Sequence, residues 1–74
     1  VALEFRRSVF RWAAQRVRGQ VKTATWDAFW QTAVEGRPVA DVALDLSLSP
    51  GAVYVARSRV IKRLREEVEC FEEE

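Results

Sequence analysis

The sequence predicts an all-α fold: one four-helix domain whose last two helices form a helix-turn-helix. Apolar residues recur every three or four positions, and they do not alternate every second position as in a strand. Gly19 and Gly36 stand where helices would end, and Pro38 and Pro50 stand where helices would begin. A chain of 74 residues supports one small hydrophobic core. We therefore expect residues 1–74 to form a single domain.

The first helix is expected over residues 2–18. An advance of about 100° per residue places an apolar half opposite a polar half. The apolar half contains Leu3, Phe5, Val9, Phe10, Trp12, Ala13 and Val17, and the polar half contains Glu4, Arg7, Ser8, Arg11, Gln15 and Arg18. Because this pattern starts at the beginning of the chain, we expect a fragment of a longer protein with a preceding domain.

The second helix is expected to begin at Thr25 as its N-cap and to end at Gly36. Its core-facing positions follow the i, i+3, i+4, i+7, i+8 series and are Trp26, Phe29, Trp30, Ala33 and Val34. Aromatic residues at this spacing could also form a stacking platform for single-stranded bases. We favour the core, because a small domain needs large side chains to bury enough area.

The helix-turn-helix is expected over about residues 38–66. Pro38 is suited to the first turn of a short helix, and Ser49 with Pro50 caps a long one. Where the two helices cross, every expected position is apolar; these are Val42, Leu46, Leu48, Val53 and Ala56, with Ala43 as the small residue. Ser47 stands at the turn position that usually holds Gly because a positive φ is convenient there.

The long helix is predicted to have a buried side and a reading side. Its inward stripe is Val53, Ala56, Val60, Leu64, Val68 and Phe71. The other side carries our predicted DNA-binding residues, Gly51, Ala52, Tyr54, Val55, Ser58, Arg59 and Lys62. In a major groove a valine methyl can meet thymine, and arginine can bind guanine O6 and N7. The small residues at the start let the helix N-terminus approach a phosphate.

Weaker phosphate contacts are expected from Arg37, Ser49, Arg57 and Arg63. Arg57 lies about 40° from the centre of the apolar stripe, so its stem is expected to pack while its guanidinium reaches Asp41, Asp45 or a phosphate. The alternative for Arg63 and Arg65 is ordinary surface pairing with the glutamates four residues on, Glu67 and Glu69.

The charge distribution favours a polyanionic partner. Residues 1–65 hold all 12 Lys and Arg but only 5 of the 11 Asp and Glu, a formal charge of +7. The remaining acids form the tail, residues 66–74, which is expected to be a solvated helix end. The arginines of the first helix are expected to form a solvated face rather than a second DNA site; they are Arg6, Arg7, Arg11, Arg16 and Arg18.

Other function classes are disfavoured by composition. The chain has no His and one Cys, Cys70, so no intrachain disulfide or zinc site of the usual kind can form, and a reducing cytosol is expected. No apolar run is long enough for a membrane span. No nucleophile stands beside a base, so we expect neither enzymatic activity nor a cofactor.

The segment "EGRPVADVALDLSLSPGAVYVARSRVIKRLRE" resembles region 4 of bacterial sigma factors of the extracytoplasmic-function (ECF) group. The resemblance covers about residues 24–67 and is carried by Pro50-Gly51-Ala52-Val53 and by Arg63-Leu64-Arg65. It implies a cytoplasmic module that binds the −35 promoter element through the second helix of the pair. It also implies contact with the β-subunit flap of RNA polymerase and, often, control by an anti-sigma protein. Where the family commonly has Lys or Arg, Ser and Arg, this chain has Tyr54, Val55 and Ala56, which predicts a more apolar, thymine-directed readout.

Two alternatives remain open. The first is the helix-turn-helix effector domain of a response regulator, which would dimerise through its final helix. The end of this chain, "EEVECFEEE", is a poor dimer seam, so a monomer would favour the sigma-factor interpretation. The second is a protein-interaction module that uses Trp12 and the arginine-rich first helix to hold an acidic partner.

Overall fold

The computed structural model describes residues 2–73, with side chains described for residues 6–70. This part of the chain is helical and contains no strand, which confirms the all-α prediction. The elements in chain order are α1 (Ala2–Arg18), α2 (Thr23–Phe29), the π-helical η1 (Trp30–Val34), α3 (Val39–Asp45) and α4 (Pro50–Glu73).

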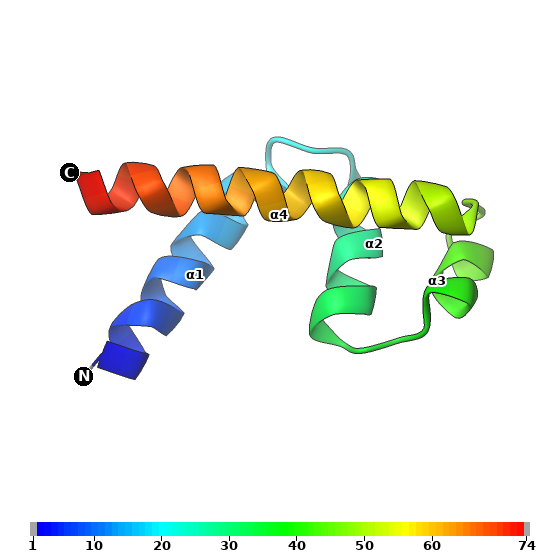
Figure 1. Cartoon of the computed structure of the whole chain (residues 1–74), viewed down its shortest axis with the longest axis horizontal. Helices are drawn as coiled ribbons and strands as arrows, with labels where there is room; N and C mark the ends of the chain where they lie inside the picture. The colour runs from blue at the N-terminus through cyan, green and yellow to red at the C-terminus, as the bar shows by residue number, and fades with distance from the viewer. Residues whose placement is uncertain (1, 74) are drawn as a thin grey trace.

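Helix α4 forms the spine of the molecule. It has 24 residues and runs along the longest dimension, 39 Å, while the shorter helices α1, α2 and α3 pack along one side of it (Figure 1). Toward its N-terminal end α1 diverges from α4, so the two helices are closest near the C-terminal end of α1 (Figure 1). On α4, residues such as Tyr54, Val55 and Arg59 are left exposed by this arrangement.

Two apolar clusters hold α4 to the other helices. The first joins α4 to α1 and α2, and its buried members are Ala13, Ala14, Val17, Trp26, Phe29, Val60 and Leu64. The second joins α4 to α2 and α3, and its buried members are Ala28, Val42, Ala43, Val53 and Ala56, with Val39, Leu46 and Leu48 packed against them. The predicted inward stripe of α4 is therefore confirmed through Leu64, and Val68 is half-buried. The side chain of Phe71 lies outside the described residues.

One position of the predicted α1 core is wrong. Val9, Ala13 and Val17 are buried as expected, but Phe10 is 42% exposed. Its ring lines the open groove between α1 and the α2–η1 segment, which is described below. Leu3 and Phe5 also belonged to the predicted stripe, and their side chains lie outside the described residues.

The second helix differs from the prediction at its start. We expected Thr25 to be the N-cap, but α2 begins at Thr23 and the cap position is Lys22, which makes no side-chain cap hydrogen bond. The carbonyl of Lys22 accepts a hydrogen bond from the Trp26 amide at 3.0 Å, which extends the helix backward. Thr25 is therefore inside the first turn.

The second helix also differs at its end, where it widens into η1. The Glu35 amide donates to the Trp30 carbonyl at 3.0 Å, an i to i−5 bond that places more residues in one turn and rotates the side chains that follow. As a result Ala33 and Val34 are exposed, against the prediction, and Thr32 is buried. The Thr32 hydroxyl is satisfied because it donates to the Ala28 carbonyl at 2.6 Å. Gly36, at φ +73°, then ends the segment as expected.

The connection between α3 and α4 follows the prediction closely. Ser47 has φ 56°, the positive value expected at this turn position. The Ser49 hydroxyl accepts a hydrogen bond from the Ala52 amide at 3.1 Å, so Ser49 caps α4 and Pro50 is its first residue. Pro38, in contrast, lies at the N-cap of α3 and not inside its first turn. Across this connection the chain bends by 100°.

No single helix among the described residues is long and apolar enough to cross a membrane. Only α3 and α4 taken together pass such a test, by length and composition alone, and they are the pair bent at the turn.

Candidate nucleic-acid interface

The predicted DNA-binding residues lie together on the uncovered side of α4. We call this surface the α4 outer face; it comprises Gly51, Ala52, Tyr54, Val55, Ser58, Arg59 and Lys62. All of them are exposed except Ala52, which is half-buried. Tyr54 is 56% exposed and Val55 is 48% exposed. Two large apolar side chains therefore face solvent on the same side of α4 as the polar residues of this face. The helix places these residues outward because Val53, Ala56 and Val60 fill the core side.

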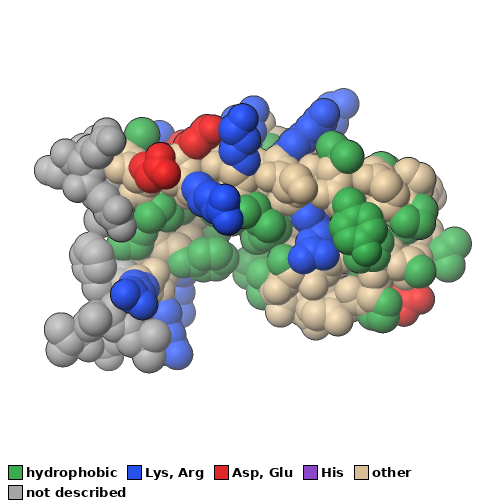
Figure 2. Space-filling model, in the orientation of Figure 1, with side chains coloured by type: hydrophobic (Ala, Val, Ile, Leu, Met, Phe, Trp, Pro, Cys, Tyr) green, Lys and Arg blue, Asp and Glu red, His purple; other side chains and the backbone are tan. Residues whose placement is uncertain are grey.

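The cations of this face are available to a partner. Neither Arg59 nor Lys62 makes a side-chain hydrogen bond or ion pair with any residue whose side chain the structure describes. With Arg63 and Glu66 they line a shallow hollow of about 380 Å³. Figure 2 shows Lys and Arg side chains gathered over the middle of α4. The α4 outer face is therefore basic at its C-terminal end, which is the middle of α4.

The start of α4 is open to close approach. A Cβ placed on Gly51 would meet nothing nearer than the Ser49 hydroxyl at 4.0 Å, so internal packing does not require glycine there. The Ala52 amide is already occupied by Ser49, as described above. Both Ser49 and Gly51 are exposed, so they lie where a backbone phosphate could approach the helix end.

Arg37 is engaged within the protein. Its guanidinium donates to the side-chain oxygen of Gln31 at 2.6 Å and to the carboxylate of Asp45 at 2.5 Å. The hydrogen bond to Asp45 raises the pKa of Arg37 above its ordinary value. Arg37 thus ties η1, through Gln31, to α3, a role that the sequence did not indicate.

Arg57 is half-buried beside the apolar side of α4, as its position predicted. It makes no ion pair with Asp41 or Asp45 in the described part of the chain, so of the three partners left open for its guanidinium only the phosphate still stands. Asp45 is paired with Arg37 instead. A phosphate contact by Arg57 stays a prediction.

The expected surface pairs within α4 are not found among the described residues, and Glu67 and Arg63 contact α1 or Gln20, just after α1, instead. Glu67 does not pair with Arg63; it accepts from the Arg16 Nε at 2.8 Å and from the Gln20 side-chain amide at 2.9 Å. These hydrogen bonds, Gln20 first and Arg16 second, lower the pKa of Glu67 below its ordinary value of 4.5. Arg63 donates instead to the Gln20 side-chain oxygen at 3.2 Å. No ion pair between Arg65 and Glu69 is found among residues 6–70.

Arg16 is therefore part of the contact between α1 and α4 and not of a purely solvated face. Its guanidinium carbon also lies 5.0 Å from the centre of the Trp12 ring, within the range of a cation–π interaction. Residues 16 and 67 are 51 positions apart, and no spacing pattern links residues so distant in the chain. Only the packing of the two helices brings them together.

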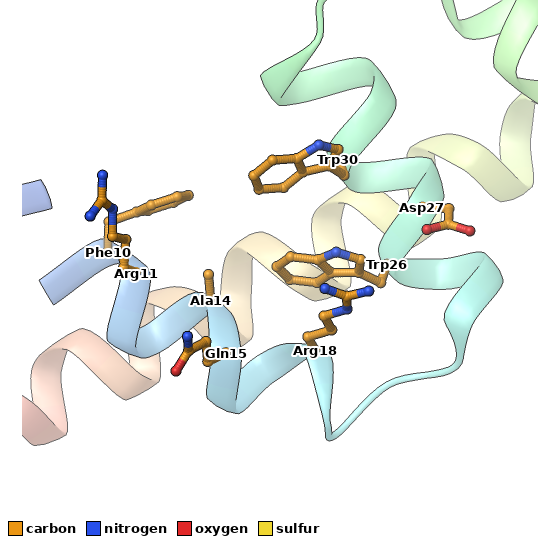
Figure 3. Close-up of a pocket in the computed structure, with 8 residues that line it drawn as sticks. All are labelled: Phe10, Arg11, Ala14, Gln15, Arg18, Trp26, Asp27 and Trp30. Carbon is orange, nitrogen blue, oxygen red and sulfur yellow. The ribbon is translucent and has the colours of Figure 1, made fainter. Parts of the chain in front are cut away.

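A second surface feature is a groove of about 430 Å³ between α1 and the α2–η1 segment. We call it the α1–α2 groove; its lining residues are Phe10, Arg11, Ala14, Gln15, Arg18, Trp26, Asp27 and Trp30. Figure 3 shows Phe10 pointing toward Trp30 across the groove, with Trp26 beneath Trp30. The two indole rings are stacked, with centroids 5.9 Å apart and planes inclined by 25°. Trp26 and Phe29 belong to the core as predicted, whereas Trp12 and Trp30 are half-buried.

Among the residues described, no group of three or more Cys, Asp and Glu side chains is placed to hold a metal ion. Comparison with models of known protein families, with curated proteins and with solved structures finds no match.

Proposed function

We propose that this domain binds double-stranded promoter DNA through the α4 outer face, in the manner of region 4 of an ECF sigma factor at the −35 element. The observation that carries the proposal is the bent pair of α3 and α4. Helix-turn-helix units join two helices at about 90–120° through a turn of three or four residues. Here the bend is 100° and residues 46–49 form the turn. Such a unit places its second helix in the major groove.

The side chains on the α4 outer face suit that placement. Arg59 has no partner within the described residues, so its guanidinium is available for the O6 and N7 acceptors of a guanine. The exposed methyl groups of Val55 suit contact with a thymine methyl, and Ser58 can donate or accept. Lys62 follows one turn later and is assigned to the phosphate backbone. Sequence readout and backbone attraction are thus supplied by one helix.

The α1–α2 groove supports a second part of the proposal, which is contact with the β-subunit flap of RNA polymerase. Its lining comes from α1, α2 and the first residue of η1, so an occupant would leave the α4 outer face free for DNA. Exposed Phe10 and half-buried Trp30 provide the apolar surface that an inserted side chain would cover. An anti-sigma protein would act by covering either surface. The proposed setting is the cytoplasm, with the domain as a monomer.

Binding to DNA can be tested by fluorescence anisotropy. The domain would be titrated against promoter duplexes and scrambled duplexes of equal length over a series of salt concentrations. We expect tighter binding to the promoter duplex and a linear fall of log affinity with log salt. Equal binding to both duplexes would remove sequence recognition from the proposal. Binding that is absent at low salt would favour the protein-interaction alternative.

The response-regulator alternative can be tested by sedimentation equilibrium of the domain. We expect a monomer across the micromolar range. A dimer that dissociates when Val68 is replaced by a charged residue would favour dimerisation through the end of α4 and hence the alternative.

A further inference from the structure

Gln20, just after α1, connects two α4 side chains through the two ends of its amide. Its nitrogen donates to Glu67 at 2.9 Å, and its oxygen accepts from the Arg63 guanidinium at 3.2 Å. We infer that Gln20 is a positioning residue for DNA: it holds Arg63 beside Arg59 and Lys62, so that the three cations face the phosphates of the DNA backbone together. This inference rests on the proposed function, because it assigns a phosphate to the face that we propose binds DNA.

Gln20 is itself held in place from both sides. Its backbone amide donates to the Val17 carbonyl at 2.9 Å, which fixes the residue at the end of α1. Its side chain bonds to Glu67, whose own side chain is only 17% exposed and is also bound by Arg16. Because the Gln20 side chain is fixed by these contacts, its oxygen can in turn fix the orientation of the Arg63 guanidinium. The orientation of Arg63 is therefore set by the packing of α1 on α4.

The Arg63 guanidinium lies beside a hollow whose other cations suit a phosphate. Arg59, Lys62 and Arg63 stand at i, i+3 and i+4 on α4, and they line the same hollow of about 380 Å³. Arginine and lysine are the usual partners of backbone phosphates. An arginine that is already ordered loses less conformational freedom on binding than a free one. Glu66 also lines the hollow, and its carboxylate would repel a phosphate.

The test uses a short duplex of random sequence at low salt, because phosphate contacts do not depend on sequence. We expect Gln20→Ala to weaken binding about threefold and to reduce the salt slope by about 0.9, the change for one lost phosphate contact. Gln15→Ala is the matched control, since Gln15 is an exposed glutamine of α1 with no hydrogen bond to α4 among the described residues. Glu66→Gln is expected to strengthen binding. Thermal unfolding of each variant confirms that it is folded.

A double-mutant cycle separates positioning from a general loss of structure. In an Arg63→Ala background, Gln20→Ala should have no further effect, because the guanidinium that it orients is gone. Additive effects of the two substitutions, or unchanged affinity and salt slope in Gln20→Ala, would overturn the inference. If the unmodified domain bound no DNA, the proposed function would fail as well, so the two failures are distinguishable.

A measurement without DNA examines the same contact. NMR relaxation of the arginine side chains should show that the Arg63 guanidinium is more ordered than that of Arg59, and that Gln20→Ala removes the difference. Equal mobility of Arg63 in the two proteins would overturn the inference independently of any binding result.

Discussion

Arg59 and Lys62 are three residues apart on α4, and their chemistry assigns them different tasks. Arginine can bond two acceptors on a guanine edge, whereas lysine acts as a point charge. We expect Arg59→Ala to cost about 1–3 kcal/mol of binding free energy on the promoter duplex and to relax the preference at one base pair. Anisotropy against duplexes substituted one base pair at a time measures both effects.

Lys62→Ala serves as the comparison. It should weaken binding to promoter and scrambled duplexes alike and lower the salt slope by about one unit. If Arg59→Ala also weakened both duplexes equally, its assignment as a base reader would be wrong.

Glu67 predicts a dependence of stability on pH. Its hydrogen bonds with Gln20 and Arg16 lower its pKa below the ordinary value of 4.5, so the folded state binds fewer protons than the unfolded state near that pH. The stabilising contribution of the carboxylate is therefore present above about pH 4.5 and is lost as the pH falls through the lowered pKa.

We expect the free energy of unfolding to fall more steeply below pH 4.5 in the wild type than in Glu67→Gln, whose side chain does not titrate. Urea unfolding between pH 7 and pH 3 measures the difference. Parallel curves for the two proteins would show that the contacts of Glu67 do not stabilise the fold.

At the scale of elements, the turn before α4 gives a direct stability prediction. Ser47 adopts φ 56°, a conformation that costs a non-glycine residue energy because its Cβ approaches the carbonyl oxygen. Ser47→Gly should raise the free energy of unfolding by about 1 kcal/mol. The matched control is Ser58→Gly, the same chemical change inside α4, which should lower it by about 0.5 kcal/mol. A loss of stability in Ser47→Gly would contradict the account of this turn.

The same elements show which parts of the fold the sequence can predict. The turn and the cap of α4 depend on local geometry, so Ser47, Ser49 and Pro50 were identified from their neighbours alone. The inward stripe of α4 was equally clear, because 3.6-residue periodicity persists along a long helix. Local turn geometry and regular apolar spacing are therefore sufficient to predict α4 and the turn before it, which carry the candidate site.

Prediction failed where a residue depends on a distant part of the chain or on an irregular helix. The π-helical turn of η1 moved Thr32 inward and Val34 outward, and nothing in the spacing of the apolar residues marks such a turn. Phe10 is exposed because it lines the open α1–α2 groove, which is a property of packing and not of periodicity. Gln20 acquired its partners only when α1 met α4.

In the molecule as a whole, α4 both packs against the other helices and presents an exposed face to solvent. One side of this helix fills both apolar clusters, and the other presents the α4 outer face. Because the α1–α2 groove lies on other elements, the two surfaces that we propose for two partners do not overlap. The basic centre of α4 favours DNA for the first surface.

The measurement that tests this account most directly is an NMR titration of the isotopically labelled domain with a short DNA duplex at low salt. We expect backbone amide shifts to concentrate between Ser49, the cap of α4, and Lys62, with little change at the α1–α2 groove. Raising the salt concentration should reverse the shifts, because counterion release drives phosphate binding. Shifts confined to α1 and α2, or no shifts at any DNA concentration, would contradict the proposal that the α4 outer face binds DNA.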